Sequence, residues 1–150
     1  MFYLLLSQNT RLRMKPFLKI TSAVLLLFNG IGAFYGGLHL ILHPDGSSIG
    51  LSTDWLKHSS FDSFFIPGLV LFLVNGLFDF FVLWQLVFNK SNSGVYVVAQ
   101  GTVLCGWILI QILLLQSVYF LHYLLGGVGL ALVFLGYFLG RKQKSSATSY

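Results

Sequence analysis

The residue of this sequence that most clearly suggests chemistry is Asp79, an acidic side chain inside a long apolar stretch. An acid in membrane hydrocarbon costs about 2.5–3.5 kcal/mol on insertion scales, so its side chain is expected to face protein or water. Asn75 precedes it by four residues, a spacing that places both on one face of a helix. Other amides lie in apolar stretches elsewhere. The candidate intramembrane polar cluster comprises Asn29, Asn75, Asp79, Gln100 and Gln111.

Two interpretations of this cluster compete. In the first, the side chains line a cavity that binds a polar head group or conducts a proton. In the second, they form hydrogen bonds between helices, worth about 0.6 kcal/mol each, which favours packing as the role of the amides. An acid inside a membrane is functional by default. Asn29 and Asp79 fall at similar depth, so we expect them to meet; a neutral Asp79 could also donate to Asn29 or Asn75.

A second candidate site lies in and beside residues 43–63, a long polar loop. His39 and His43 are four residues apart, so a helix would place both imidazoles on one face, as a metal or cationic ligand requires. In the alternative, these histidines lie at the membrane interface and the acids serve turns and helix caps. The absence of H-E-x-x-H and of a close Cys/His cluster favours the alternative. The candidate outer-loop residues are His39, His43, Asp45, Asp54 and His58.

Motifs for catalysis and cofactor binding are missing from the sequence. No G-x-S-x-G is present, and Cys105, the single cysteine, lies in an apolar stretch with no histidine placed to activate it. Phosphate-cradling loops and dinucleotide fingerprints are also absent. We therefore assign no catalytic residue, no metal ligand and no cofactor, and we lean against an enzyme. Nucleic acid is not an expected partner, because the basic residues flank apolar stretches without a soluble module.

Composition defines the elements that must position these residues. Hydrophobic residues make up 56% of the 150 residues and charged residues only 9%, which excludes a water-soluble monomer and a disordered chain. Backbone groups in lipid must pair within their own segment, so each apolar window of spanning length should be a helix. These windows are approximately residues 20–42, 64–88, 96–116 and 119–139. The predicted fold is all-α, a polytopic membrane protein with a four-transmembrane-helix bundle and one structured extracytoplasmic loop.

Turn signals mark the ends of these helices. The last two windows nearly touch, and Gln116-Ser117 is the polar break at which the chain must reverse. Residues 43–46, His-Pro-Asp-Gly, predict a tight turn at the membrane surface. Residues 52–54, Ser-Thr-Asp, are expected to cap a short helix that carries Trp55 into the interface. Pro67 should fall near the first turn of the second span.

Basic residues set the predicted orientation. Of the nine Lys and Arg residues, eight lie on one side of the predicted spans and Lys57 alone lies on the other. The positive-inside rule then places both termini and the short middle loop in the cytoplasm, with the chain in the cell (inner or plasma) membrane. The eight are Arg11, Arg13, Lys15, Lys19, Lys90, Arg141, Lys142 and Lys144.

This orientation divides the chain into three parts. Residues 1–19 form a cytoplasmic N-terminal segment, residues 20–140 the transmembrane domain, and residues 141–150 a cytoplasmic basic tail. We interpret residues 1–13 as an upstream extension from a misassigned start, because Met14, followed by Lys15 and Pro16, offers a second possible start just before the first span. A cleavable signal peptide fits less well, since its apolar region is typically about 7–15 residues.

Small residues at four-residue spacing form stripes on the first and fourth predicted spans. Such stripes let helix backbones approach closely, either within one chain or between chains. Besides the lipid bilayer, the expected partners are therefore a second copy of the chain or another membrane protein. The pairs are Gly32 with Gly36, Ala33 with Gly37, Gly127 with Ala131, and Gly136 with Gly140.

Several short motifs carry a resemblance to known proteins. They are Gly36-Gly37, Pro44-Asp45-Gly46-Ser47, Gly50-Leu51, Phe65-Ile66-Pro67-Gly68-Leu69, Leu71-Phe72, Trp107-Ile108 with Gln111, and Gln116 with Tyr119. On these motifs, roughly Lys15 to Leu139 resembles a family of small four-span bacterial membrane proteins. In size and span count the chain is also similar to the DoxX-like group. The resemblance implies the four-span fold and transfers no activity, cofactor or site residue.

Three classes of function follow from these observations, in order of preference. The first is a non-catalytic membrane module that binds lipid or a partner protein. The second is an oligomeric transporter or proton-handling unit organised around Asp79. The third is a membrane enzyme acting on lipid head groups at the outer face through the outer-loop acids and histidines.

Overall fold

The computed structural model describes the backbone of residues 2–57, 59–90 and 92–147, and the side chains of residues 16–57, 59–90 and 92–141. Every regular element in these residues is a helix, and none is a strand. The all-α fold predicted from hydropathy is therefore confirmed for the described chain. Its helices long and apolar enough to cross a membrane cover Pro16–Leu42, Phe65–Val87, Ser93–Leu115 and Phe120–Arg141.

The helix ends differ from the predicted limits by a few residues. Helix α1 (Phe2–Leu42) runs from the N-terminal segment into the first span without a break, so the predicted boundary after residue 19 is not a boundary of secondary structure. Helix α4 (Ser93–Leu115) begins three residues before the predicted window. Helix α5 (Phe120–Ala147) continues past residue 139 into the basic tail. Hydropathy locates the apolar part of a helix, and a helix can extend beyond it into water.

The second spanning helix changes its geometry along its length. It consists of α2 (Phe65–Val70), the π-helical segment η3 (Leu71–Leu77) and α3 (Phe78–Val87). Pro67 is the third residue of α2, where its missing N–H costs least, as predicted. π-Helical segments are rare, and those that occur inside longer helices are often found at functional sites. Asn75 is buried in η3, one turn from the start of α3.

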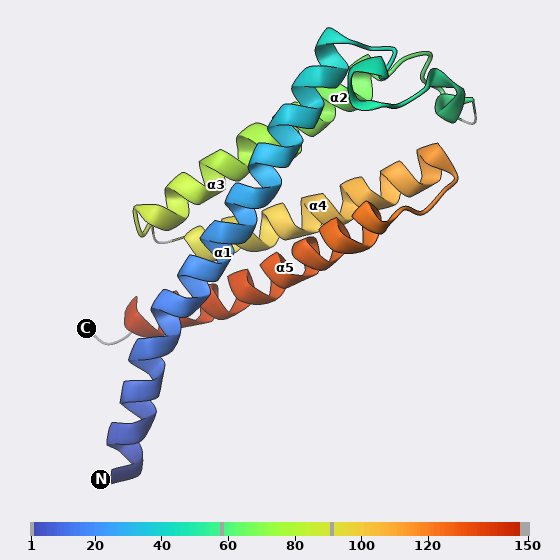
Figure 1. Ribbon diagram of the computed structural model, residues 1–150. Coiled ribbons are helices and arrows are strands. Elements are labelled where there is room, and N and C mark those ends of the chain that lie inside the picture. The colour runs from blue at the N-terminus through green and yellow to red at the C-terminus, as the bar shows by residue number, and fades with distance from the viewer. Residues whose placement is uncertain (1, 58, 91, 148–150) are drawn as a thin grey trace.

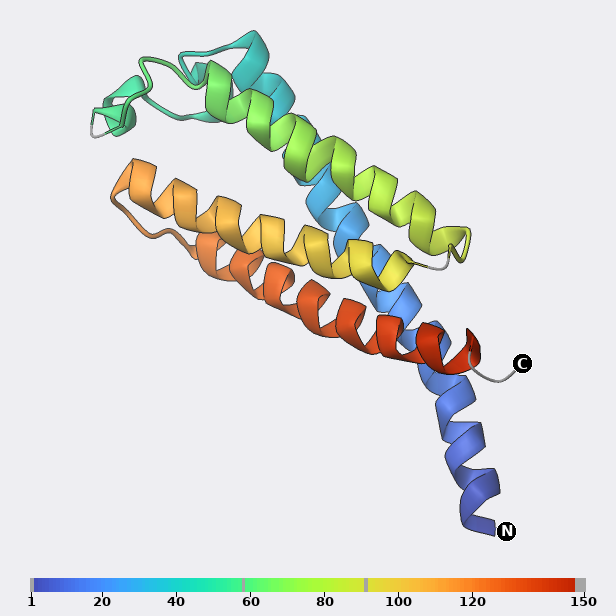
Figure 2. The same ribbon diagram turned by 180° about the vertical axis from the view of Figure 1, so that it is seen from behind.

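The helices form two antiparallel pairs that lean together. In the first pair α1 packs along α2, η3 and α3, and in the second α4 packs along α5. Contacts of α1 with α5 and of α3 with α4 join the pairs (Figures 1 and 2). Both views show α2 and α4 diverging towards the connection between α1 and α2, and α2 packs against α1 rather than against α4 or α5.

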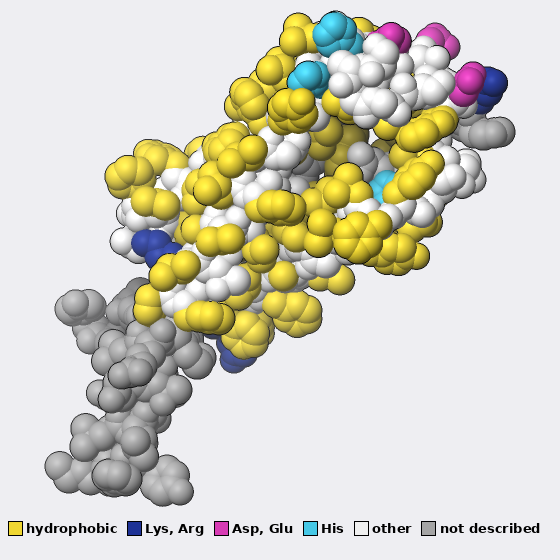
Figure 3. All heavy atoms as spheres, in the orientation of Figure 1, with side chains coloured by type: hydrophobic (Ala, Val, Ile, Leu, Met, Phe, Trp, Pro, Cys, Tyr) yellow, Lys and Arg dark blue, Asp and Glu magenta, His cyan; other side chains and the backbone are white. Residues whose placement is uncertain are grey.

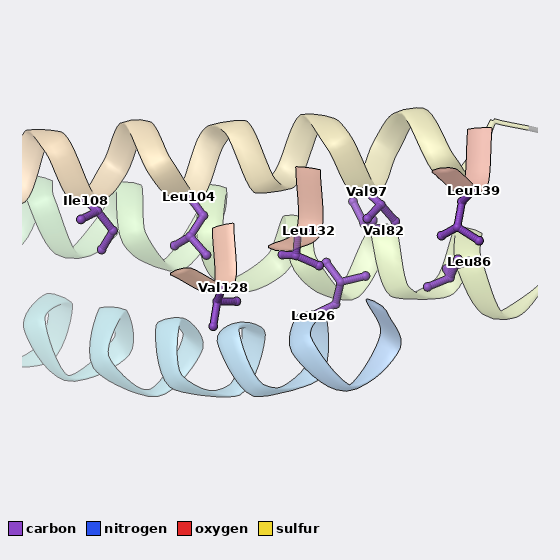
Figure 4. Close-up of a cluster of buried hydrophobic side chains, with 9 residues drawn as sticks. All are labelled: Leu26, Val82, Leu86, Val97, Leu104, Ile108, Val128, Leu132 and Leu139. Atoms are coloured by element: carbon purple, nitrogen blue, oxygen red, sulfur yellow. The ribbon is translucent and has the colours of Figure 1, made fainter. Parts of the chain in front are cut away.

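An apolar core lies where the two pairs meet. It draws on every long helix and extends along the bundle from Leu86 and Leu139 to Ile108 (Figure 4). Leu26, Val82 and Leu132 are completely buried there. Large apolar side chains cover most of the outer surface in Figure 3, which is the pattern expected when acyl chains surround the molecule. The nine core residues are Leu26, Val82, Leu86, Val97, Leu104, Ile108, Val128, Leu132 and Leu139.

Close approach within each pair depends on glycines. A Cβ atom at Gly37 would lie 2.6 Å from the backbone nitrogen of Phe72, and one at Gly136 would lie 2.6 Å from that of Val98. These positions of the predicted stripes therefore serve packing inside the chain. At Gly32 and Gly127 an added Cβ would meet nothing within 4 Å, so these positions face away from the neighbouring helices.

The connection between α1 and α2 is folded. Gly46 closes the predicted turn with φ +80° and donates its N–H to the carbonyl of His43 at 2.9 Å. Two 3-10 helices follow, η1 (Ser47–Ile49) and η2 (Thr53–Leu56), and the Ser52 hydroxyl caps η2 as predicted. Leu56 is buried with Leu40 and Phe64 in a small core of its own. The predicted structured loop is confirmed.

The reversal between α4 and α5 occurs at the predicted polar break. Gln116 ends α4 in the left-handed conformation, with φ 48°, and its side-chain amide donates to the carbonyl of Leu113 at 2.7 Å. The backbone N–H of Tyr119 donates to Nδ1 of His122 at 2.9 Å, which caps the start of α5. The Tyr119 ring stacks on Trp55 of η2, with 5.7 Å between centroids, so the loop touches this turn.

Candidate functional site

Asp79 and Asn29 form a buried hydrogen bond between the first two spanning helices. The amide nitrogen Nδ2 of Asn29 donates to Oδ2 of Asp79 at 2.5 Å, so the predicted contact between these residues is present. Asp79 is completely buried and Asn29 is 4% exposed. Gly30 allows this approach, because a Cβ there would lie 3.0 Å from Cβ of Asp79. The bond accounts for one carboxyl oxygen only.

Other polar atoms of the cluster are buried without a partner. Oδ1 of Asp79 and both amide atoms of Asn75 and of Gln100 find no hydrogen bond within the described chain. All three residues are completely buried. An unpaired polar group removed from water costs roughly 1–3 kcal/mol, so buried polar groups are normally paired. Three side chains with five unpaired atoms in the interior of the bundle are therefore not explained by packing alone.

Gln100 brings a third helix to this carboxyl. It projects from α4 and lies close enough to interact with the Asp79 carboxyl, although the two side chains do not meet the criteria of a hydrogen bond. Asp79 is the only formal charge between residues 65 and 87, and no Lys, Arg, Asp or Glu occurs between residues 93 and 115 or 120 and 140. The cluster thus combines one carboxyl with amides and contains no positive side chain.

Two of the predicted cluster residues behave differently from expectation. Asn75 lies in the π-helical segment η3, and it forms no hydrogen bond with Asp79, so the simple one-turn relation of an α-helix does not apply. Gln111 is half-buried on α4, about 16 Å along the helix from Gln100 at ~1.5 Å per residue. The structure brings Asn29, Asp79 and Gln100 together with Asn75 beside them, and Gln111 lies apart.

The structure also reveals buried polar groups that sequence reasoning missed or set aside. Trp107 is 7% exposed, and its indole N–H finds no partner in the described residues. It lies two turns from Gln100 on α4, a spacing that keeps both on one face and could have signalled their common burial. His122 is 6% exposed, but its role as the α5 cap explains it. Ser22 is buried and donates to the carbonyl of Leu18, one turn earlier in its own helix.

The outer-loop candidates do not form one site in the described residues. His43 is exposed, and His39 packs its ring against Tyr35 with 4.3 Å between centroids. Asp45 accepts from the backbone and hydroxyl of Ser47, and these bonds lower the pKa of its carboxyl. His58 lies outside the described residues.

Asp54 has a local role as well. It forms an ion pair with Lys57 at 2.9 Å, which lowers the pKa of the Asp54 carboxyl. No group of three or more His, Cys, Asp or Glu residues that could hold a metal ion occurs in the described part of the chain. Turns, caps and local ion pairs therefore account for both outer-loop acids among the candidates.

The loop end of the molecule is more open than the opposite end. Figure 3 shows a hollow there, between the segment that carries the acidic side chains and the helices beneath it. At the opposite end Lys19 joins α1 to the end of the second spanning helix, donating to the carbonyl of Val87 at 3.1 Å and to Oδ1 of Asn89 at 2.8 Å. The polar cluster lies between the end of the bundle that is joined by the Lys19 hydrogen bonds and the more open loop end.

Comparisons with known proteins add no relative. The chain matches no protein-family model, and no curated protein or solved structure is found to be similar to it. The class defined by the fold is thus a small all-α protein with four helices of membrane-spanning length. The resemblance to small four-span bacterial membrane proteins and to the DoxX-like group stays a prediction.

Proposed function

We propose that this chain is a multi-pass membrane protein, with both termini in the cytoplasm, that binds a small polar ligand inside its helix bundle without catalysing a reaction on it. The single observation that carries the proposal is the set of unpaired polar atoms on Asn75, Asp79 and Gln100. These groups are costly unless a partner satisfies them, and a bound molecule with complementary groups is such a partner.

Comparing the wild-type protein with Asp79→Asn tests this proposal. The two side chains are nearly equal in size, and the variant removes the carboxyl while leaving an amide. Native mass spectrometry of both proteins released from lipid nanodiscs should show a bound species on the wild type that is lost or strongly reduced in the variant. Asp54→Asn, at an exposed carboxyl, is the matched control and should retain it. Identical spectra for wild type and Asp79→Asn, or no bound species on either, would contradict the proposal.

Transport is the second candidate function, and the unequal packing of the two ends favours it. The cluster lies between an end joined by Lys19 and an end where α2 and α4 diverge. A protein that moves its ligand needs such an asymmetry, together with a second state in which it is reversed. Liposome flux that disappears in Asp79→Asn supports transport, whereas ligand binding without flux supports a binding module.

The enzymatic alternative gains less from the structure. Among its candidate groups, Asp45 serves a local turn and Asp54 a local ion pair, and the His39 ring packs on Tyr35. Product formation from extracted lipids, lost in His43→Ala, is the result that would favour an enzyme over a binding module.

A further inference from the structure

We infer that the ligand of the interior cluster is an organic ammonium with a hydrogen-bonding oxygen close to its nitrogen, as in ethanolamine or an ethanolamine head group. This inference rests on the proposed binding function and names its ligand chemistry.

The sign of the ligand charge follows from Asp79. Its carboxyl is the only formal charge in the second spanning helix, and α4, which faces it, contributes none. An anion placed here would meet a carboxyl and no positive side chain, which is unfavourable at the low dielectric of a membrane interior. A cation would find a carboxyl with one oxygen already held by Asn29 and the other oxygen unpaired.

The unpaired acceptors match an ammonium group in number. Three oxygens are available, Oδ1 of Asp79, Oδ1 of Asn75 and Oε1 of Gln100. A primary ammonium has three N–H donors and no acceptor, so it can give one hydrogen bond to each. A quaternary ammonium has no N–H donor and would leave all three oxygens unpaired.

The unpaired donors require an oxygen on the same ligand. The amide nitrogens of Asn75 and Gln100 are buried without an acceptor. A bare metal ion would satisfy the oxygens and leave these donors unpaired. A hydroxyl oxygen two carbons from the ammonium has two lone pairs and can accept one bond from each of the two amides.

Calorimetric titration of the full-length protein in phosphatidylcholine nanodiscs tests the inference with four probes. These are ethanolamine, choline, ethylene glycol and acetate, which differ in charge and in N–H donors. Ethanolamine should bind at least about tenfold more tightly than each of the others, because a tenfold ratio requires only ~1.4 kcal/mol from the ion pair. Equal or tighter binding of ethylene glycol, choline or acetate overturns the ammonium assignment.

Variants link the binding to the cluster. Asp79→Asn should weaken ethanolamine binding by tenfold or more, and Gln100→Leu should weaken it by a smaller factor. The control Asp54→Asn should bind like the wild type, because Asp54 is exposed and pairs with Lys57. Undiminished binding by Asp79→Asn overturns the inference. If that variant fails to fold, the comparison of probes on the wild-type protein decides the question by itself.

Two further outcomes separate this inference from the proposed function and identify the ligand source. An Asp79-dependent species in native mass spectrometry, without binding of ethanolamine, overturns the ligand assignment and leaves the binding function standing. Nanodiscs that contain phosphatidylethanolamine distinguish a head group from a free amine. Competition by that lipid against ethanolamine supports the head group as ligand, and undiminished ethanolamine binding in its presence supports the free amine.

Discussion

At the scale of single residues, hydrogen-bond pairing divides the buried polar side chains into two kinds. Asn29 donates to Asp79, whereas Asn75 has neither amide atom paired within the described residues. A paired amide contributes to the stability of a bundle, and an unpaired one costs energy until a partner arrives. The two asparagines should therefore respond in opposite ways to the same substitution.

The first prediction compares Asn29→Leu with Asn75→Leu. Asn29→Leu removes the donor to Asp79 and should lower the free energy of unfolding by about 1–2 kcal/mol. Asn75→Leu removes unpaired groups and should leave the ligand-free protein equally stable or more stable, while weakening ligand binding. Unfolding titrations in mixed micelles measure both variants. Equal destabilisation by the two substitutions would show that Asn75 has a structural partner.

A second prediction concerns the ion pair of Asp54 with Lys57. The ion pair lowers the pKa of Asp54 below its ordinary value of 3.8. A lowered pKa means that the contribution of the carboxylate to the loop is present above pH 3.8 and is lost as pH falls through the lowered value. Lys57→Gln should raise the pKa of Asp54 towards 3.8, as followed by carboxyl carbon chemical shifts. An unchanged pKa would mean that another group holds the carboxylate.

At the scale of elements, glycine positions determine how closely the helices of each pair approach. A Cβ at Gly101 would lie 2.6 Å from the carbonyl oxygen of Gly129 on α5, and this neighbour is backbone that no rotamer change can move. A Cβ at Gly127 of α5 would meet nothing within 4 Å. The two sites allow a test of packing with similar chemistry and different surroundings.

The third prediction is that Gly101→Ala destabilises the bundle and Gly127→Ala does not. Overpacking of a tight interface costs about 1–3 kcal/mol, and here it would separate α4 from α5. Gly127→Ala should be neutral or slightly stabilising, because alanine is the better helix former. Thermal unfolding in detergent measures both. A destabilised Gly127→Ala would reveal a contact of α5 that lies outside this chain, such as a second copy.

Hydropathy and turn residues predicted the helices and turns well. They did not predict the features of a helix that depend on the helices packed against it. The break at Gln116 and the cap at Ser52 depend on local residues, so the sequence carries them directly. The π-helical form of η3 and the inward direction of Gly37 depend on what packs against them. An apolar window has similar composition on all faces and therefore does not tell the lipid side from the protein side.

The same difference holds for the candidate site. Matching depth was enough to predict the contact of Asn29 with Asp79, because depth follows from residue counting. The absence of hydrogen-bond partners for Asn75 and Gln100 follows only from the three-dimensional packing of the helices. The burial of the Trp107 indole N–H likewise emerges only when the facing helices are in place.

At the scale of the whole molecule, the even number of spanning helices and the distribution of charge make one joint prediction. Four crossings return the chain to its starting side, and eight of nine basic residues lie on that side. The positive-inside rule predicts that this side is cytoplasmic. We therefore expect the loop that carries η1 and η2, and the open end of the bundle with it, to face outwards.

The fourth prediction tests this orientation with single cysteines in a Cys105→Ser background. Ser60 and Asn92 are exposed and lie in the two connections that flank the second spanning helix. A membrane-impermeant maleimide should label Ser60→Cys without permeabilisation, when it is added to cells whose outer layers are removed and whose cell membrane is intact. Asn92→Cys should react only after the membrane is permeabilised. The reversed labelling pattern would show that the chain has the opposite orientation, with the open end of the bundle on the cytoplasmic side. Labelling of both sites from outside would show that the second spanning helix does not cross the membrane.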